Sequence, residues 1–580
     1  MTVRGVKGMN YFGVYHQDYL QRNGSICDAP CVSKGRMMLC AHATASESGL
    51  IAMVNGRVRG RADLASALGL PRETETARLV LAAYRKWGFD YPRHIEGPAV
   101  TCVMDSAKDA MVLSRDRMGE QPVFYAGKSD KLAFSDHPDT LLKNASAEPI
   151  VDADGLRELF GLGPVRTPGR TFFRDIAMLE PGCALIASCD SLRTERYFDI
   201  EAHPHEDDAA RTVERVRALL EAAVDEIAPL EPAVMLSGGL DSTSLTALLA
   251  RHRSDILSFS VDYQDNARDF QPNSFRPEMD APYVARAVRA CHTQHRTVVL
   301  DSQSIAAALG RAVSLRGFPG MADIDTSLLL FSRDIARFSR NVVSGECGDE
   351  VFGGYPWFRG DATMDGFPWS GSLALRESLL APELRDTLKL PEYVNDMYET
   401  HRVAADPGAE YAPKERRLKT MQKLCFQYFM TNLQERAVRM CEGAGVRVFT
   451  PLCDDRLARY VYNVPWDMKF MGGQEKGLFR EAMRDLLPEP LLRRTKSPYP
   501  KTCSPQYSQI VRQMALRLTM DADAPIQRLI DKEQLVRIAR SDLDPADTPW
   551  YGQLMSGPQL LGYIWQINRW MRERNVMLRL

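Results

Sequence analysis

Small residues surround one carboxylate in "LSGGLDSTS", residues 236–244, which follows the apolar run "PAVML" and opens a helical pattern. A strand-to-helix turn of this kind exposes backbone N–H groups at a positive helix N-terminus, which favours an anion. Gly238 and Gly239 let the backbone approach a phosphate closely. Asp241 would repel a bare phosphate, so its position predicts Mg²⁺ bound to that phosphate.

A second segment, "VVSGECGDEVFGGY" (residues 342–355), repeats the order of strand, small residues and carboxylates. Asp349 is its candidate for a second Mg²⁺ ligand. The ends of parallel strands share one edge of a sheet, so the two loops are expected to converge on one ligand. Two carboxylates beside a polyphosphate are typical of metal-assisted chemistry.

Strand and helix patterns alternate around these loops, as in βαβ units with a parallel sheet. The alternating stretches are "AVML", "TSLTALLARH", "ILSFSVDY", "APYVARAVRACH", "HRTVVLD", "TSLLLFSRDIARF" and "RNVVSGE". Before residue 200 the pattern is one of antiparallel hairpins, with a helix at "TETARLVLAAYRKWG". Helical patterns dominate from about residue 360 onward. A boundary is expected near the acidic segment 199–210.

Composition excludes several classes of function. Lys and Arg number 73 and Asp and Glu 75 among 580 residues, so the charge balance does not favour nucleic acid or an anionic membrane as partner. No apolar run approaches the roughly 18 residues that span a membrane. The N-terminal segment lacks the apolar region of a signal peptide, and a cytoplasmic location is expected.

Twelve scattered cysteines are expected to be reduced thiols. A zinc site is one hypothesis for the group Cys27, Cys31, Cys40 and His42. The spacing of these residues fits no standard zinc pattern, so ordinary thiols are favoured.

The motifs "LSGGLDSTS", "FSVDY" (residues 259–263) and "SGECGDEVFGGY" together resemble the asparagine synthetase B family, which includes β-lactam synthetases and lasso-peptide cyclases. The resemblance implies an N-terminal-nucleophile-type antiparallel sheet sandwich at 1–205. It also implies a parallel-sheet, adenine nucleotide α-hydrolase-like synthetase domain at 206–580, so the fold class is α/β and α+β in two domains. It further implies a ligase that binds ATP and Mg²⁺, adenylates a carboxylate, releases pyrophosphate and lets an amine displace AMP.

The family's site residues carry over to matching positions of this sequence. The resemblance assigns Lys496, in "LLPEPLLRRTKSPYPK", and Glu346 to catalysis, with Lys501 as the next candidate lysine. It assigns Asp241 and Asp349 to the metal. The residues implied for nucleotide binding are Leu236, Ser237, Gly238, Gly239, Asp241, Ser242, Val261, Ser344 and Gly345.

The N-terminal part resembles the family's glutaminase in degenerate form. Asn55 and Gly56 match its oxyanion-hole pair, and "SRDRMGEQPVFY" (residues 114–125) matches a further motif. Thr2 stands where the family has its nucleophilic cysteine. The residues that bind glutamine are not found in "RETETARLV" or "LCAHATASES". We therefore expect ammonia or an amine, rather than glutamine, as the nitrogen source.

The acyl substrate is also in question. Asp323 falls where asparagine synthetases carry an arginine for aspartate, and a carboxylate there is expected to repel the α-carboxylate of aspartate. Two hypotheses for the enzyme activity stay open. The first is an amide ligase that uses ammonia or an amine. The second is an intramolecular macrolactam- or β-lactam-forming cyclase, for which a precursor peptide and a leader protease are the expected partners. A nucleotide-binding regulator on an inactive scaffold is the non-enzymatic alternative, and a homodimer is left open.

Overall fold

The computed structural model describes residues 11–15, 30–34, 36–128, 131–272, 277–359, 366–541 and 549–580. The chain divides into two compact units: residues 1–158, 166–199 and 575–580 form one, and residues 159–165 and 200–574 form the other. Among the described residues no helix is long and apolar enough to cross a membrane.

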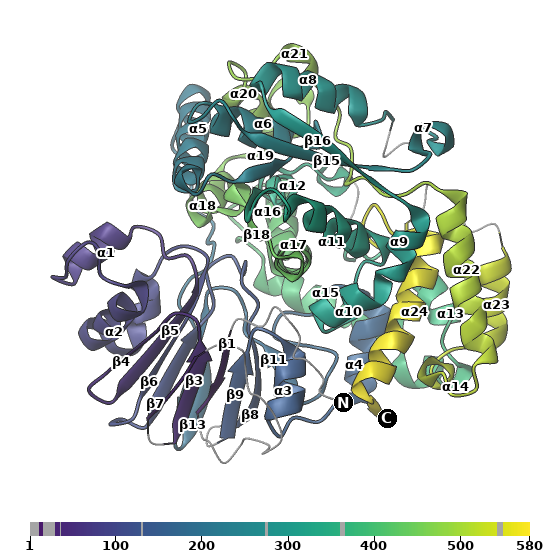
Figure 1. Cartoon of the computed structure of the whole chain (residues 1–580), viewed down its shortest axis with the longest axis horizontal. Coiled ribbons are helices and arrows are strands. Elements are labelled where there is room, and N and C mark those ends of the chain that lie inside the picture. Colours follow the sequence, from purple (N-terminus) through teal and green to yellow (C-terminus); the bar gives the residue numbers. More distant parts are fainter. Residues whose placement is uncertain are drawn as a thin grey trace. The chain divides into compact units, whose positions relative to one another are not determined.

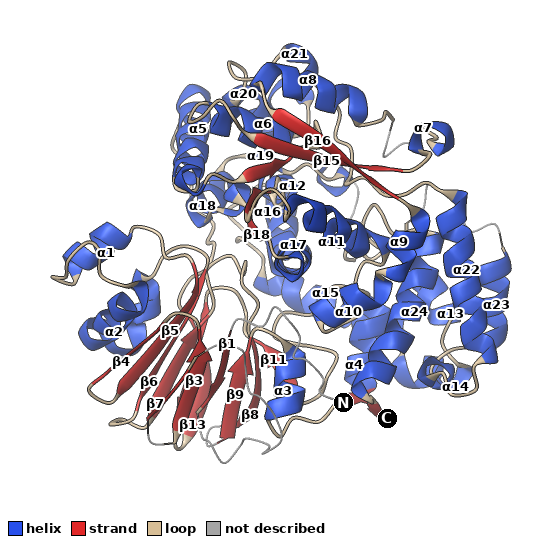
Figure 2. Ribbon diagram, viewed as in Figure 1, coloured by secondary structure: helices blue, strands red, loops and turns tan. Residues whose placement is uncertain are grey.

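The first unit contains two six-stranded antiparallel sheets, drawn as two layers of strands in Figure 2. The first sheet has the order β11-β8-β9-β1-β3-β2 and the second the order β13-β12-β7-β6-β5-β4. The strands of the first are Ile176–Met178, Phe124–Lys128, Lys131–Ser135, Tyr11–Val14, Met37–Ala41 and Cys31–Lys34. Those of the second are Ser191–Arg196, Cys183–Ser188, Ala110–Ser114, Ala99–Asp105, Leu50–Gly56 and Thr44–Glu47.

Two apolar layers stabilise this unit. One lies between the sheets and includes Leu39, Met53, Leu113 and Phe134. The other lies between the second sheet and the helices α1 (Arg61–Ala67) and α2 (Thr76–Trp87). Strand β6 of the second sheet contributes to both layers and is buried along its whole length, and this explains why most of its residues are apolar.

Cys31 and Cys40 form a disulfide between the adjacent strands β2 and β3. The expectation of reduced thiols is therefore wrong for this pair, because their strand positions lie directly opposite each other. The zinc hypothesis loses two of its ligands, and the described residues contain no group of three or more potential metal-binding side chains. Cys27 and Thr2 lie outside the described residues.

The second unit is built on a five-stranded parallel sheet of order β16-β15-β14-β17-β18. Its strands are Gln294–Leu300, Leu257–Tyr263, Ala233–Met235, Asn341–Val343 and Arg447–Phe449. Figure 1 shows α6 (Leu240–Ala250) and α8 (Ala281–Cys291) on one side of this sheet and α11 (Asp323–Ile335) and α17 (Thr431–Ala444) on the other. Buried apolar side chains of α11 and α17 pack against β14, β15 and β17.

Further helices complete the second unit. They are α5 (Ala209–Asp225), α9 (Ser302–Ala307), α10 (Leu309–Arg316), α12 (Gly348–Phe352), α15 (Leu390–Ala404), α16 (Pro413–Leu424), α18 (Asp455–Asn463), α19 (Trp466–Lys469), α20 (Gly477–Ala482), α22 (Pro505–Met520), α23 (Lys532–Arg540) and α24 (Gly557–Arg574). The carboxyl ends of the central strands β14 and β17 lie side by side in the sheet, and the two sequence motifs begin there.

Candidate active site

The loop after β14 is closed by its own hydroxyl groups. The backbone N–H of Ser237 donates to Ser242 Oγ at 3.1 Å, and the N–H of Gly239 donates to Ser237 Oγ at 3.3 Å. Gly238 has a φ of +71°, and a Cβ there would lie 2.6 Å from the backbone nitrogen of Val284. Only glycine fits this position, since both its dihedral and its contact exclude a side chain. The loop therefore turns tightly into α6 and places Asp241 in the first turn of that helix.

The loop after β17 packs directly on the first loop. A Cβ on Gly345 would lie 3.0 Å from Asp241 Cβ, and a Cβ on Gly348 would lie 2.7 Å from Asp241 Cγ. These glycines let the backbone of the second loop approach the Asp241 side chain. The short helix α12 then places Asp349 beside Asp241, so the structure brings the two predicted loops together at one edge of the sheet.

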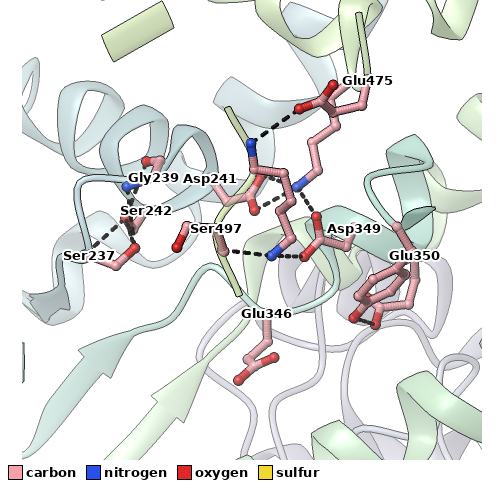
Figure 3. Close-up of polar contacts among 12 residues, drawn as sticks. Ser237, Gly239, Asp241, Ser242, Glu346, Asp349, Glu350, Glu475 and Ser497 are labelled. Carbon is pink, nitrogen blue, oxygen red and sulfur yellow. Dashed lines mark hydrogen bonds and ion pairs between the residues drawn. The ribbon is translucent and has the colours of Figure 1, made fainter. Parts of the chain in front are cut away.

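Lys476 joins the two carboxylates of Asp241 and Asp349, which are labelled in Figure 3. Its Nζ lies 2.7 Å from both carboxylate oxygens of Asp241 and 2.6 Å from Asp349 Oδ1. Lys496 lies on the other side of Asp349, with its Nζ 2.8 Å from Oδ2. The two carboxylates and two ammonium groups balance in charge, and only Lys476 contacts both carboxylates.

The titration of this cluster follows from burial and from the neighbouring charges. Burial alone would raise the pKa of Asp349, but the charges of Lys476 and Lys496 lower it to about 2. Burial and the nearby Asp349 raise the pKa of Asp241, against the charge of Lys476. Burial lowers the pKa of Lys476, but Asp241 and Asp349 outweigh it and the pKa is raised. The ion cluster is thus held by contacts within the site rather than by solvent.

The role of Lys476 in the site was not predicted from the sequence. This lysine lies in "GGQEKGLFR", a segment with no recognisable spacing, and adopts a left-handed backbone conformation (φ 55°) directly before α20. Its side chain is nevertheless buried. A lone lysine among glycines and polar residues gives no local signal, so only its partners in the fold identify it. Its neighbour Glu475 accepts a hydrogen bond from the backbone N–H of Lys496 at 3.1 Å and ties the two lysine segments together.

Glu346 points away from the lysines and pairs with Arg436 of α17 (Figure 3 shows the Glu346 side chain). Arg436 Nη1 donates to Glu346 Oε1 at 3.0 Å, and its Nε lies 3.4 Å from Asp325 Oδ1. Glu350 is separate from this pair: it accepts a 2.6 Å hydrogen bond from the hydroxyl of Tyr355, and burial together with Asp349 raises its pKa to about 8. Of the carboxylates in this loop, Glu346 is thus the one set apart from the Asp241–Asp349 cluster and held by an arginine.

The prediction that Asp323 would face the acyl substrate is wrong. Its neighbours Met321 and Ile324 line the cavity, whereas Asp323 is fully buried and does not. Burial raises the pKa of Asp323 to about 6, while Gln559, Lys501 and Tyr507 oppose the shift. The reason is the phase of α11, which turns this side chain toward α22 and α24. Lys501 lies there too and donates to Leu554 O and Ser556 Oγ, both at 3.1 Å.

One cavity of about 440 Å³ connects these groups. It is lined by all the predicted site residues except Gly238: Leu236, Ser237, Gly239, Asp241, Ser242, Val261, Ser344, Gly345, Glu346, Asp349 and Lys496. Gly238 does not line the cavity, but its backbone conformation allows the turn that places the neighbouring residues there.

The residues present fit a hard divalent cation held jointly with phosphate. Asp241 and Asp349 offer adjacent carboxylate oxygens, which contact the ammonium groups of Lys476 and Lys496 in this structure. The described residues provide no third carboxylate, cysteine or histidine for a closed cage. Mg²⁺ typically uses one or two carboxylates and completes its coordination with water and substrate phosphates.

Comparison with known proteins agrees with this geometry. Residues 215–572 match the family model described as asparagine synthase, and residues 49–198 match the model described as glutamine amidotransferase domain. A Bacillus subtilis protein named asparagine synthetase [glutamine-hydrolyzing] 3 is 34% identical, over 98% of this chain and 94% of its own length. A Mycobacterium tuberculosis protein named putative asparagine synthetase [glutamine-hydrolyzing] is 24% identical, over 73% of this chain and 69% of its own length.

Proposed function

Because this chain belongs to the asparagine synthase family, whose members are ATP-dependent ligases, we propose that it adenylates a carboxylate and transfers the acyl group to ammonia or an amine. The observation that carries this proposal is the single cavity in which the Asp241–Asp349 pair, two lysines and Glu346 meet. In this reaction a carboxylate oxygen attacks the α-phosphorus of ATP and pyrophosphate leaves. The amine then attacks the acyl carbon, AMP leaves and the amine loses a proton.

Each residue has a defined part in this proposal. The N–H groups and hydroxyls of the loop at 237–242 bind the pyrophosphate, as helix N-termini do. Mg²⁺ held by Asp241 and Asp349 would neutralise phosphate charge. Lys496 places a positive charge where negative charge develops at the α-phosphorus and the acyl oxygen. Glu346 has one carboxylate oxygen on Arg436 and the other available to accept the amine proton.

Support for ammonia or an amine as nitrogen source lies in the first unit. The side-chain amide of Asn55, which matches the glutaminase oxyanion hole, donates to Gln121 Oε1 at 3.3 Å. This contact uses one of the two N–H donors of the amide and ties Asn55 to Gln121. The segments that should bind glutamine also lack their expected residues. The cyclising alternative would use the same residues of the second unit, and among the described residues no contact favours it over reaction between separate molecules.

The experiment is glutamate release from the purified protein with glutamine, ATP and Mg²⁺. We expect no release above background and no change in the Asn55→Ala variant, because that amide is not used on substrate. Amide formation from ¹⁵N-labelled ammonium is followed in parallel. Steady glutamate release of about 1 s⁻¹ or more, a typical enzyme turnover, contradicts the proposed nitrogen source.

A further inference from the structure

The cavity has a second end, away from the pyrophosphate loop, which we call the acyl end. Its lining includes the apolar residues Met321, Ile324, Phe429, Leu433 and Leu554, beside the uncharged polar residues Tyr355, Tyr499 and Gln553. The first four of these side chains are buried. Ile324 lies in the first turn of α11 and Met321 just before that helix, whereas Phe429 lies in the helical turn that leads into α17 and Leu433 lies in α17 itself.

The acyl end is continuous with Glu346. Phe429, Leu433 and Arg436 are spaced by four and three residues on adjoining helical turns, so they lie on one helix face. Arg436 contacts Glu346 at one end of that face and Ile324 O, at 3.3 Å, beside it. The ring of Tyr355 packs edge-on against Phe429, with the centroids 5.4 Å apart. The group flanking the reacting carboxylate would therefore lie against this wall.

The charges at the acyl end are already balanced. Arg316 Nη1 donates to Asp325 Oδ2 at 3.3 Å, and Asp325 pairs in turn with Arg436, which holds Glu346. Two arginines and two carboxylates make this chain neutral, and Arg316 and Asp325 are fully buried. The Arg436 guanidinium donates hydrogen bonds to Glu346 and to the carbonyl of Ile324, and it forms an ion pair with Asp325, its Nε lying 3.4 Å from Oδ1.

The energetics of burial favour an apolar occupant. A substrate that carried its own α-carboxylate into this end would bury a charge with no free cation opposite it among the described residues, and such a charge is costly. An apolar flank would instead remove its own apolar surface and that of the wall from water, which favours binding. Ligand sites of this kind, mostly apolar with few polar groups, recognise shape and apolar surface.

We infer that the acyl end takes a carboxylic acid whose flanking group is apolar and bears no second charge, rather than free aspartate. This inference rests on the proposed function, since that function places the reacting carboxylate between Lys496 and Glu346. It names a substrate class that the proposed function leaves open.

Equilibrium binding tests the inference separately from catalysis. The whole protein is saturated with Mg²⁺ and α,β-methylene-ATP, which cannot release pyrophosphate, and is titrated in a calorimeter with 3-phenylpropanoate or with L-aspartate. We expect 3-phenylpropanoate to bind about tenfold more tightly or better, which is the scale of a modest gain in apolar contact. Tighter binding of aspartate, equal binding or no binding of either acid overturns the inference.

Two variants sharpen this result. Leu433→Arg places an unpaired cation in the wall and should shift the ratio of the two affinities toward aspartate by about tenfold or more, the size of a new charge-assisted contact. Leu433→Met keeps the apolar wall and a similar volume and should preserve the wild-type order. If Leu433→Arg does not fold, the wild-type and Leu433→Met titrations still decide the question.

ATP–pyrophosphate exchange with the preferred acid separates the two proposals. Preferential binding of 3-phenylpropanoate without exchange contradicts the adenylation chemistry and leaves the specificity of the acyl end standing. Exchange with aspartate at a higher kcat/KM than with 3-phenylpropanoate supports adenylation and overturns the inference.

Discussion

At the scale of single residues, the two site lysines occupy unequal positions around Asp349. Lys476 contacts both Asp241 and Asp349, and its side chain is buried at 3% exposure. The ammonium group of Lys496 pairs with Asp349 and donates to Ser497 O at 3.0 Å, and the side chain is 16% exposed. The geometry therefore gives Lys476 a part in holding the carboxylate pair and its ligand, and leaves Lys496 freer to move toward reacting groups.

This difference predicts distinct kinetic effects. Lys496→Met should leave ATP affinity within about threefold of wild type but slow pyrophosphate release by roughly 10²- to 10³-fold, the usual cost of losing one transition-state donor. Lys476→Met should weaken ATP binding itself, since Asp241 and Asp349 lose their shared counter-charge. Lys501→Met is the control, because Lys501 does not line the cavity. ATP affinity and pyrophosphate-release rate are measured for each folded variant. An unimpaired Lys496→Met would mean that the catalytic lysine is misplaced.

At the scale of elements, α12 is the short helix that carries Asp349, and its carboxyl end is held by α16. Gln422 of α16 donates through Nε2 to Glu350 O at 3.1 Å and to Val351 O at 2.7 Å. Lys469 of α19 donates to Gln422 Oε1 at 2.8 Å and fixes the orientation of that amide. A five-residue helix has few hydrogen bonds of its own, so these contacts position Asp349 from outside.

Lys469 and Lys419 predict a pH dependence of stability. Burial lowers the pKa of Lys419 to about 8 and that of Lys469 well below its ordinary value. The folded state thus binds fewer protons than the unfolded state between about pH 8 and 10.5, and unfolding takes up protons in that range. Stability from these groups rises with pH through this window and is lost as pH falls, by up to about 1.4 kcal/mol per pH unit for each proton.

Thermal unfolding of Lys469→Met checks this sign. The melting temperature of wild type minus that of the variant should increase between pH 7 and pH 9.5. Unfolding of wild type requires the neutral buried amine to take up a proton, which becomes less favourable as the pH rises, whereas the variant has no such amine at position 469. Lys414→Met, an exposed change on α16, is the control, and its difference from wild type should stay flat. A difference for Lys469→Met that shrinks with rising pH would contradict the neutral state of the buried amine.

The elements of the site were predictable from the sequence, but their inward and outward faces were not. Apolar runs that alternate with helical patterns predicted the strands β14, β15, β16 and β17. The glycine-containing loops after β14 and β17 predicted the position of the cavity. The prediction for Asp323 was wrong because chain position does not fix which way a side chain points from the first turn of a helix. Lys476 was missed because a lysine without a motif is locally indistinguishable from a solvated one. Tertiary packing determines both.

At the scale of the whole molecule, the predicted family and fold class are confirmed, with antiparallel sheets in the first unit and a parallel sheet with helices in the second. The second unit contains every residue that lines the cavity. The central claim is accordingly that this unit activates a carboxylate by transfer of AMP, and not of the terminal phosphate.

Separation of the nucleotide products tests that claim most directly. The protein is incubated with ATP, Mg²⁺, ammonium and a panel of carboxylic acids that includes 3-phenylpropanoate and aspartate, and AMP, ADP, pyrophosphate and phosphate are quantified. The account predicts AMP and pyrophosphate in equal amounts, formed only with a suitable acid and lost in Asp349→Asn. ADP and phosphate as the main products, or AMP formation that is independent of the acid, would contradict it.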